Sequence, residues 1–500
     1  MEHRNMKTIV LGPPGTGKTE TLLDKVEDHL KKTDPNKIGF FAFTQKAANK
    51  ARDRAMKKFS YTEDDLPYFR TLHSLAFRRL GIKKENVMQK MHYQDLGKEI
   101  GFDVDYMEYD DEEGGTFTTK SDYLRIIQLA KLRNITVSQQ YDRKEHTQIV
   151  EFNKLKIIAN ELERYKKEYN LVDFNDMILN FKSGVCPKFD VVFIDEAQDL
   201  SLMQWDMAKT IWDKSENNYI AGDDDQAIFK WAGADVNRFI TLGGEYIKLT
   251  QSYRIPAKIH EFAMKIINKV GNRIPKNWKP RTVEGSLSTY ADFRHIDMSK
   301  GEWLILTRTR SMLDELEDVV YKNGLYYKNK FKKSYEQDLY DAINDWEHLR
   351  QGQLLNYKQV EKIYSYMSKN NVEKNKLKIM IKDAFFGIDQ LSNQYGLKTK
   401  NVWYEAFDNA PSKKVSYIRQ MRKNGEQLNK KPRIILSTIH GVKGGEADNV
   451  VLLTDLSRQT LREYERVPDD VNRLFYVGAT RTKEHLHIVE PKDIYKAFRI

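Results

Sequence analysis

Short, almost wholly apolar runs recur along the chain, and segments of helix length separate them. The first set of runs comprises residues 8–11, 39–44, 191–195, 219–222 and 246–250. The second set comprises residues 303–307, 434–438, 450–454 and 485–489. Runs of this kind are typical of parallel strands that are buried on both faces of a sheet. The sequence therefore predicts an α/β fold in which the parallel-sheet pattern occurs twice.

A long, charged segment interrupts the first set of runs. Its apolar residues have helical spacing, so we interpret residues 82–185 as a mostly helical insertion. The first sheet domain then comprises residues 1–81 and 186–260.

A second polar, helix-like segment interrupts the second set of runs. We interpret residues 325–432 as a reduced accessory insertion into a second sheet domain of residues 261–324 and 433–500. The expected core residues of this insertion are Trp346, Trp403 and Tyr417.

The charge and the cysteine content restrict the partners and the compartment. Lys and Arg number 83 against 72 Asp and Glu, which gives a formal net charge of +11 and favours a polyanionic partner without proving one. The single cysteine, Cys186, can form neither an internal disulfide nor a thiolate metal site. No signal peptide or apolar stretch of membrane-spanning length is visible. We therefore expect a cytoplasmic protein without membrane contact.

Residues 12–19 read Gly-Pro-Pro-Gly-Thr-Gly-Lys-Thr, which fits the P-loop pattern after a strand and before a helix. Glycines let backbone N–H groups approach a phosphate, and the helix N-terminus adds its positive dipole. Lys18 can reach the β- and γ-phosphates, and the Thr19 hydroxyl can hold Mg²⁺. The expected nucleotide contacts are Gly12, Pro13, Pro14, Gly15, Thr16, Gly17, Lys18 and Thr19.

The apolar run at residues 191–195 ends in a pair of carboxylates. Asp195 is expected to hold Mg²⁺, and Glu196 to orient and deprotonate the attacking water. Together with the P-loop, this pair indicates hydrolysis of a nucleoside triphosphate. P-loops also serve kinases, transporters and GTPases, so these two motifs alone leave the class of protein open.

Five ordered segments identify a family. They are Asp-Glu-Ala-Gln-Asp at 195–199, Gly-Asp-Asp-Asp-Gln-Ala-Ile-Phe-Lys-Trp-Ala-Gly-Ala at 222–234, Gln-Ser-Tyr-Arg at 251–254, Ser-Thr-Ile-His-Gly-Val-Lys-Gly-Gly-Glu at 437–446 and Leu-Phe-Tyr-Val-Gly-Ala-Thr-Arg at 474–481. They resemble motifs of superfamily 1 helicases, most closely those of the UvrD/Rep/PcrA-like group. The resemblance runs from about residue 8 to residue 489, with gaps at the two insertions.

The resemblance implies that ATP and Mg²⁺ bind between two RecA-like motor domains. Arg254 and Arg481 look like the two arginine fingers that stabilise transition-state charge. Tyr253 matches the residue that stacks on the base, although an aromatic residue that packs between domains is the alternative. Three further contacts are implied: γ-phosphate sensing by Gln226, coupling by Gln198 and ribose binding by Glu446.

The resemblance also implies a track for single-stranded DNA, which proteins hold by aromatic stacking and backbone contacts. Phe229 and Trp231 are expected to stack on bases beside Gln226, although two core aromatic residues are the alternative. The other expected DNA contacts are Phe43, Thr44, His73, Thr438, His440 and Lys443.

Two other segments receive structural interpretations. Residues 171–176, Leu-Val-Asp-Phe-Asn-Asp, resemble an element of this family to which we assign a structural role. Residues 272–281 are basic and contain Trp278; we interpret them as a solvated basic loop rather than a nucleic-acid contact.

The resemblance implies an ATP-dependent DNA helicase that moves 3′ to 5′ along single-stranded DNA and acts at single-strand/duplex junctions. We expect a monomer that is nucleoid-associated if bacterial or viral, with replication, repair or recombination as the setting. Two alternatives stay open: a single-strand translocase or nucleoprotein remodeller that unwinds weakly, and a nucleotide-switched, DNA-binding recruitment platform.

Overall fold

The computed structural model describes residues 6–110, 116–146, 149–182, 184–331, 337–427 and 430–499. By its internal contacts the chain divides into two compact units. The first unit is Met1–Thr289 with Ile439–Ile500, and the second is Tyr290–Thr438. The boundaries of the two predicted motor domains stay a prediction.

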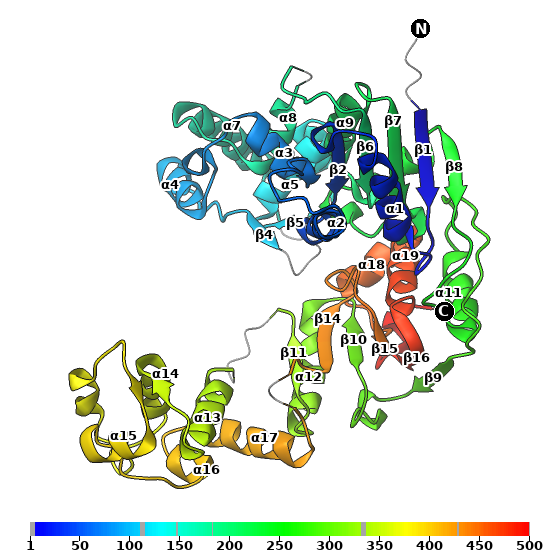
Figure 1. The fold of residues 1–500 in the computed structure, drawn as a ribbon. Helices are drawn as coiled ribbons and strands as arrows, with labels where there is room; N and C mark the ends of the chain where they lie inside the picture. Colours follow the sequence, from blue (N-terminus) through cyan, green and yellow to red (C-terminus); the bar gives the residue numbers. More distant parts are fainter. Residues whose placement is uncertain are drawn as a thin grey trace. The chain divides into compact units, whose positions relative to one another are not determined.

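The first sheet has six strands, all parallel, in the order β3-β2-β6-β7-β1-β8 (Figure 1). Its strands are β1 (Met6–Leu11), β2 (Ile38–Ala42), β3 (Phe69–Arg70), β6 (Val191–Asp195), β7 (Asn217–Gly222) and β8 (Glu245–Lys248). Every residue of β2 and β6 is buried. The apolar runs of the sequence therefore lie where a strand has neighbours on both sides and helices on both faces.

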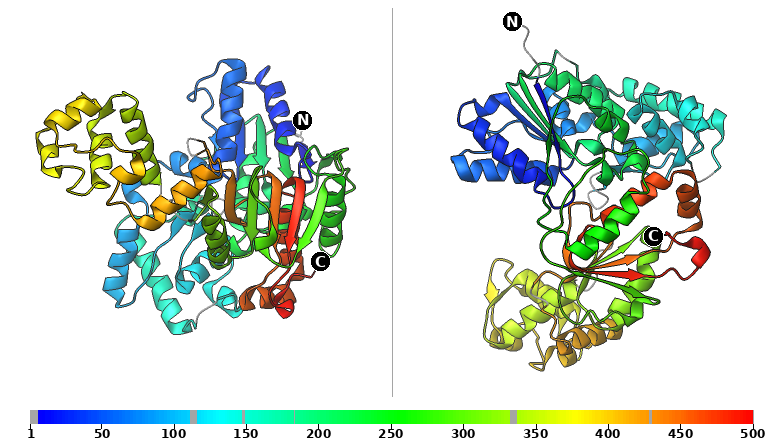
Figure 2. Two further views of the ribbon diagram at one scale, coloured as in Figure 1. Left: turned by 90° about the horizontal axis from the view of Figure 1, so that it is seen from below. Right: turned by 90° about the vertical axis from the view of Figure 1, so that its right-hand side faces the viewer.

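Helices cover both faces of this sheet (Figure 2). One face packs against α1 (Lys18–Leu30) and α2 (Gln45–Phe59), and the other against α3 (Leu72–Arg79), α8 (Phe174–Asn180) and α9 (Leu202–Trp212). Consecutive side chains of a strand point to opposite faces, so Phe40 joins the first core and Phe41 the second. The short helix α10 (Val236–Ile240) follows the motif after β7.

The segment between β3 and β6 is mostly helical. It contains α4 (Lys90–Ile100), α5 (Asp122–Leu132), α6 (Val137–Asp142), α7 (Phe152–Glu168) and α8, with a small hairpin of β4 (Glu108–Asp110) and β5 (Thr116–Thr118). Its own core includes Leu96, Ile127 and Leu155. This segment therefore has a hydrophobic core separate from that of the sheet.

The second sheet has the strand order β11-β14-β10-β15-β16-β9. Its strands are β9 (Ser286–Tyr290), β10 (Trp303–Thr307), β11 (Tyr327–Asn329), β14 (Ile434–Thr438), β15 (Ala447–Leu453) and β16 (Thr482–Val489). The accompanying helices are α11 (Ala257–Ile267), α12 (Leu313–Lys322), α18 (Arg458–Arg466) and α19 (Pro468–Ala479). Two parallel six-stranded sheets confirm the predicted α/β class. The pattern of apolar runs does not reveal β3 and β11, which are very short, or β9, which is polar.

The second unit carries its own helical part. It comprises α13 (Gln337–Arg350), α14 (Tyr357–Ser365), α15 (Ile388–Gln394), α16 (Trp403–Ala406) and α17 (Ser412–Lys423), with a hairpin of β12 (Leu355–Asn356) and β13 (Phe385–Phe386). Trp346, Trp403 and Tyr417 are all buried in its core, as predicted. Trp346 Nε1 donates to the Asn401 carbonyl at 3.0 Å, and the Tyr417 hydroxyl donates to the Leu325 carbonyl at 2.6 Å.

Across the described part of the chain, no helix combines the length and the apolar character that crossing a bilayer requires.

Replacing Trp346 by Ala should destabilise this helical core by about 3–5 kcal/mol, because a fully buried indole leaves a cavity behind. Urea or thermal unfolding measures the loss. The matched control is Tyr404→Ala, since Tyr404 on α16 is 42% exposed and its loss should cost much less stability. Equal losses for the two variants would contradict the packing described for Trp346.

Candidate functional site

The P-loop connects the end of β1 to the start of α1 in the first unit. Gly15 and Gly17 have φ values of +72° and +80°, in the left-handed region that favours glycine. A Cβ on Gly12 would lie 2.6 Å from the Lys18 Cβ, so a side chain there would collide with the lysine. Thr16 closes the loop by donating its backbone N–H and its hydroxyl to the Pro13 carbonyl, at 3.2 and 2.8 Å. Glycine conformations and hydrogen bonds within the loop therefore define its shape.

Lys18 and Glu196 form an ion pair, with 3.0 Å between Nζ and Oε1. Burial disfavours the Lys18 ammonium, but the carboxylates of Glu196, Asp195 and Asp223 outweigh it and raise the lysine pKa. Burial likewise disfavours the Glu196 carboxylate, but Lys18 and Lys443 hold its pKa well below the usual range. Glu196 is also one of the few non-glycine residues with a positive φ, 54°. A strained backbone at this position fits a side chain that the fold aims at the P-loop.

Thr19 and Asp195 bring two hard oxygen ligands together. The Thr19 hydroxyl donates to Asp195 Oδ2 at 3.0 Å. Burial and the neighbouring Glu196 raise the pKa of Asp195, because its negative charge lacks full compensation there. Hydroxyl and carboxylate oxygens are the ligands that Mg²⁺ prefers, and a divalent cation would offset the cost of this buried charge. These residues therefore fit the predicted metal.

Gln226 and Arg481 meet close to the same loop. Arg481 Nη2 donates to Gln226 Oε1 at 3.0 Å, and Gln226 Nε2 donates to Asp223 Oδ2 at 2.7 Å. Burial and the nearby charge of Arg254 lower the pKa of Arg481 to about 9. The guanidinium is still protonated at neutral pH, so two like charges lie close together beside the P-loop. An anionic ligand such as a triphosphate would relieve this repulsion.

Arg254 packs directly on the P-loop. A Cβ on Gly15 would collide with the Arg254 Cβ, and Arg254 Nη2 pairs with Glu446 Oε2 at 2.5 Å. Arg254 Nε is buried and has no hydrogen-bond partner within the described residues. An orphaned guanidinium nitrogen fits a phosphate oxygen. The resemblance predicts a ribose contact for Glu446, which here pairs with Arg254.

Ser252 also contacts the P-loop, which the sequence did not predict. Its hydroxyl donates to the Pro14 carbonyl at 2.8 Å and accepts from the backbone N–H groups of Arg254 and Ile255, at 3.3 and 3.2 Å. Next to it, the Tyr253 N–H donates to the Gly15 carbonyl at 2.8 Å. The Gln-Ser-Tyr-Arg segment is thus fastened to the P-loop through its backbone. No sequence signal marks the serine, because its position in the motif pattern accepts any residue.

The ring of Tyr253 is 75% exposed, and its backbone is anchored beside the P-loop. It therefore does not act as a packing residue within the first unit. An exposed aromatic face at this place fits the predicted base stacking.

Gln198 and Lys443 connect Glu196 to its surroundings. Gln198 Nε2 donates to Glu196 Oε2 at 2.5 Å, and Gln198 Oε1 accepts from the Asp223 N–H at 3.0 Å. Lys443 pairs with Asp199 and donates to the Gln226 carbonyl at 2.9 Å. Burial raises the pKa of Asp199 to about 6, against the opposing charge of Lys443. Lys443, predicted to contact DNA, is occupied by these protein groups in this structure.

Aromatic side chains gather beside this network. The rings of Phe43 and Phe229 stack with centroids 5.5 Å apart, and Trp231 meets His440 edge to face at 5.7 Å. Phe229 is only 1% exposed, so its ring is packed among these neighbours, whereas Phe43 and Trp231 are partly exposed. The sequence thus predicted which residues form this cluster. The burial of Phe229 fits the alternative of a core aromatic residue.

Three other predicted DNA contacts have different surroundings. Thr44 caps α2 by accepting from the Ala47 N–H at 3.3 Å. His73 lies on α3, where burial lowers its pKa to about 4, so the ring is neutral at physiological pH. Thr438 is buried at the end of β14 and belongs to the second unit.

The basic segment 272–281 is not the solvated loop that was predicted. Lys276 is 4% exposed, and its Nζ lies 2.5, 3.0 and 3.2 Å from carboxylate oxygens of Asp224, Asp225 and Asp223. Arg273 donates to both oxygens of Asp225, at 2.8 and 2.5 Å. The prediction failed because three adjacent buried aspartates require cations, and a charged run in sequence does not show its tertiary partners.

Segment 171–176 has the structural role that was predicted. Asp173 caps α8, and the carboxylates of Asp173 and Asp176 pair with Lys131 and Lys166 at 2.6–3.0 Å. Glu163 pairs with the same two lysines at 2.7 and 2.9 Å. The three acidic side chains lie close enough to hold a metal ion, but the ammonium groups of Lys131 and Lys166 already pair with all three.

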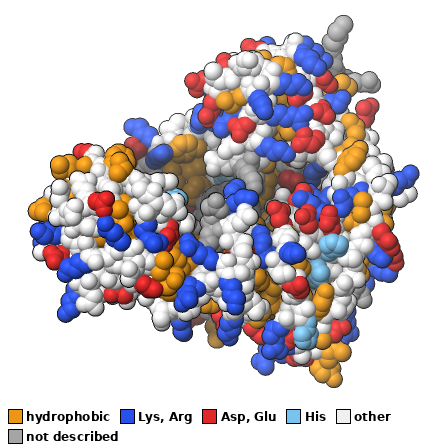
Figure 3. Space-filling model, turned by 60° about the horizontal axis from the view of Figure 1, so that its bottom comes forward, with side chains coloured by type: hydrophobic (Ala, Val, Ile, Leu, Met, Phe, Trp, Pro, Cys, Tyr) orange, Lys and Arg blue, Asp and Glu red, His pale blue; other side chains and the backbone are white. Residues whose placement is uncertain are grey.

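Lysine and arginine side chains are scattered over the face drawn in Figure 3, where acidic side chains lie among them. Among the residues that the structure describes, this face shows no single basic patch that would account for the net charge of +11.

Comparison with known proteins finds two matching family domains in this chain. Residues 1–247 match the UvrD/REP helicase N-terminal domain, and residues 293–492 match the UvrD-like helicase C-terminal domain. The chain is similar to proteins named ATP-dependent DNA helicase PcrA. It is 23% identical to that of Bacillus subtilis (strain 168) over 64% of this chain and 48% of the relative. The identity to the protein of Leuconostoc citreum is 24%, over 72% of this chain and 50% of the relative. The identity to the protein of Staphylococcus aureus (strain Mu50 / ATCC 700699) is 24%, over 64% of this chain and 48% of the relative.

Each match spans about half the length of the relative. The two domain matches lie in the order that the motifs of the sequence require and together cover most of the chain. The chain belongs to the UvrD-like family of superfamily 1 helicases, in the UvrD/Rep/PcrA-like group.

Proposed function

We propose that this protein is an ATP-dependent DNA helicase that moves along single-stranded DNA. The observation that carries the proposal is the convergence of cationic and polar side chains on one P-loop. Lys18 pairs with Glu196, Arg254 packs on Gly15, and Arg481 donates to Gln226. These residues come from distant parts of the sequence, and hydrolysis of a triphosphate requires such groups together.

Each side chain has a distinct proposed task. Lys18, Arg254 and Arg481 bind phosphate oxygens and stabilise the negative charge that develops during transfer. Thr19 and Asp195 hold Mg²⁺, which when bound with ATP neutralises phosphate charge. Glu196 accepts the proton of the attacking water at a carboxylate oxygen, and its lowered pKa keeps it ionised for that task. Gln198 orients Glu196, Tyr253 stacks on the base and Glu446 contacts the ribose.

Coupling to DNA is proposed to run through the segment that follows β7. Gln226 touches Arg481, and Phe229 and Trp231 lie three and five residues further on. Lys443 donates to the Gln226 carbonyl and lies over the Phe229 ring, 5.1 Å from its centroid. A change at Gln226 on loss of the γ-phosphate would therefore reach the aromatic cluster directly. Phe43, Thr44, His73, Thr438, His440 and Trp231 are proposed to contact the strand.

By resemblance to the family, we further propose that the protein moves from 3′ to 5′ and acts at single-strand/duplex junctions. We also propose that it is a monomer and acts in the cytoplasm, in replication, repair or recombination. A translocase that unwinds weakly is the second candidate. This chain matches only about half of each relative. Any contribution that the unmatched half of a relative makes to unwinding cannot be assigned to this chain, which supports the translocase as a second candidate.

Glu196→Gln should lower single-strand-stimulated ATP turnover by about a hundredfold or more, because the variant lacks the proton acceptor. Binding of single-stranded DNA should persist. The measurement is steady-state ATPase beside fluorescence anisotropy of a labelled strand. Glu20→Gln, on an exposed carboxylate that pairs with Lys50, is the control and should hydrolyse ATP normally. Normal turnover by Glu196→Gln would refute the assigned role.

Partial duplexes with a 3′ or a 5′ single-stranded tail test polarity and unwinding together. We expect ATP-dependent strand displacement from the 3′-tailed substrate alone. Displacement from the 5′-tailed substrate alone would reverse the polarity. Stimulated ATPase without displacement would favour the translocase, and ATPase without stimulation would favour a recruitment platform.

Lys276→Met should lower ATP turnover more than it raises KM for ATP. Without the ammonium, the three aspartates repel one another, and Asp223 no longer holds Gln226 in place for Arg481. Lys265→Met, which breaks only an exposed ion pair with Glu261, is the matched control. Steady-state kinetics and a thermal melt of each variant separate positioning from unfolding. A folded Lys276→Met variant with unchanged kcat would contradict the positioning role.

A further inference from the structure

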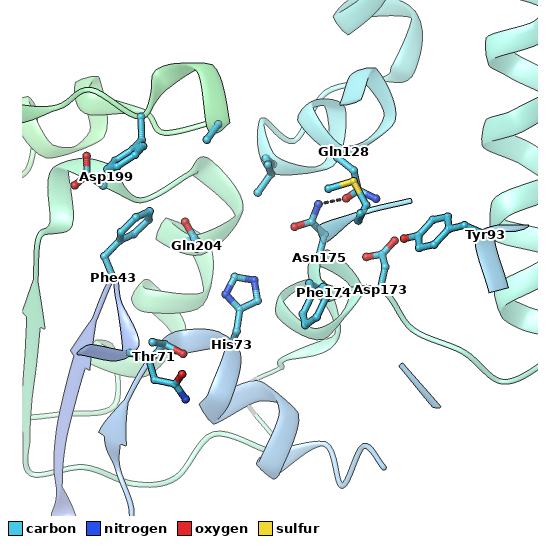
Figure 4. A pocket seen from close by; sticks show the side chains of 15 residues that line it. Phe43, Thr71, His73, Tyr93, Gln128, Asp173, Phe174, Asn175, Asp199 and Gln204 are labelled. Carbon is cyan, nitrogen blue, oxygen red and sulfur yellow. Dashed lines mark hydrogen bonds between the residues drawn. The ribbon is translucent and has the colours of Figure 1, made fainter. Parts of the chain in front are cut away.

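A cavity of about 290 Å³ in the first unit lies beside aromatic side chains that the proposed function assigns to DNA (Figure 4). Figure 4 shows Phe43 and Asp199 on one side of it, and Gln128 and Asn175 of the first insertion on the other. This cavity therefore belongs to the proposed DNA track. A separate surface, on the helical part of the second unit, carries none of the residues assigned to ATP or DNA.

The hairpin of β12 and β13 fixes two apolar side chains on its outer face. Leu355 and Phe386 pair across the hairpin, and both are buried in the core of the helical part. Consecutive side chains of a strand point to opposite faces, so Leu354, which precedes β12, and Phe385 point outward. A Cβ on Gly387 would lie 3.3 Å from Leu354 Cδ2, which places the Leu354 side chain over β13. Turning either outward residue inward would shift the register and expose its buried neighbour.

Two isoleucines extend this outer face. Ile379 and Ile381 flank Met380, which is buried in the same core with extended backbone, so both isoleucines point away from the core. The Ala384 N–H donates to the Ile381 carbonyl at 3.2 Å, and this tight turn brings Ile381 beside the start of β13. Exposed apolar side chains that lie together mark interaction sites. The apolar patch so formed, 61–65% exposed at each position, comprises Leu354, Ile379, Ile381 and Phe385.

Lysines alternate with the patch residues along the chain. Residues 374–382 contain no acidic residue and four lysines: Lys374, Lys376, Lys378 and Lys382. None of the four ammonium groups pairs with a carboxylate among the residues that the structure describes, and the flanking Glu373 pairs with Lys398 instead. Other lysines of this helical part, such as Lys362 and Lys400, do pair with carboxylates, at 2.6 Å. The unpaired positive charge beside the patch therefore favours an acidic partner.

We propose that the apolar patch and its four lysines dock an acidic segment of a partner protein. Leu, Ile or Phe side chains of that segment pack on the patch, while its carboxylates pair with the lysines. Nucleic acid fits this surface less well, because Ile379 and Ile381 offer no flat ring face on which bases stack. A second copy of the chain fits less well too, since a symmetric contact would bring like charges together. The contact would tether the protein to its partner and needs no nucleotide.

Selection from a random-peptide display library on the full-length chain tests the proposal. The enriched peptides should combine Asp and Glu with Leu, Ile or Phe. Labelled synthetic copies should bind the Ile381→Ser/Phe385→Ser double variant about tenfold more weakly by fluorescence anisotropy, because two large apolar side chains no longer bury surface. Lys378→Glu/Lys382→Glu should also weaken binding, and added salt should weaken binding to the wild type.

Ile494→Ser is the matched control, because Ile494 is 74% exposed and belongs to the first unit. It should bind the selected peptides as tightly as the wild type does. Thermal melts and ATPase rates that match the wild type show that the substitutions leave the fold and the motor intact. Leu354→Ser replaces the Ile381→Ser/Phe385→Ser variant if the latter does not fold.

A selection without acidic, apolar peptides, or selected peptides that bind the folded patch variants normally, would overturn the docking site. An equal loss of oligonucleotide binding by Lys378→Glu/Lys382→Glu would assign the surface to nucleic acid and overturn the protein partner. A dimer in sedimentation that Ile381→Ser/Phe385→Ser dissociates would assign the patch to a second copy. Each outcome is independent of whether single-stranded DNA stimulates ATPase, which tests the proposed function.

Discussion

The ion pair between Lys18 and Glu196 joins two parts of the first unit on which the rest of the site depends. Lys18 begins the helix after β1, and Glu196 follows the last residue of β6. Because the sheet is parallel, both strands end at the same edge, and β7 lies between them in the strand order. Asp223, which follows β7, adds the third charge at that edge. The site is therefore a consequence of strand order as much as of any motif.

Some buried charges of this unit pair with opposite charges of the protein, whereas two largely buried arginines lie near each other. Lys276 and Arg273 pair with the three aspartates after β7, and Lys443 pairs with Asp199. Such pairs are costly to break, because removing one partner leaves an uncompensated buried charge. Arg254 and Arg481, in contrast, lie near each other with only partial compensation from Glu446 and Glu196. The groups that pair with opposite charges of the protein hold the scaffold, and the two neighbouring guanidinium groups mark the place where an anionic ligand fits.

The segment from Asp223 to Trp231 brings these functions together within nine residues. Asp223 holds Gln226, Asp224 and Asp225 hold the basic segment, and Phe229 lies in the aromatic cluster. Arg473 on α19 adds a contact by donating to the Asp224 carbonyl at 2.9 Å. A displacement of this short segment would move both Gln226, the proposed phosphate sensor, and the aromatic side chains. That proximity is the physical basis of the coupling proposed here.

The amino-acid sequence by itself determined the α/β class, the P-loop and most of the strands, because continuous apolar runs and glycine spacing are local properties of the chain. It also determined which residue types surround the loop, since the motifs carry them in order. Only the tertiary structure decided the partners. Lys443 meets Asp199 across 244 positions of sequence, Lys276 turns inward to the aspartates, and Ser252 fastens its segment to the P-loop. Phe229 is buried where exposure was expected, and Gln128 comes to line a cavity. Burial and charge pairing depend on which distant segments the fold brings together, and no local pattern records that.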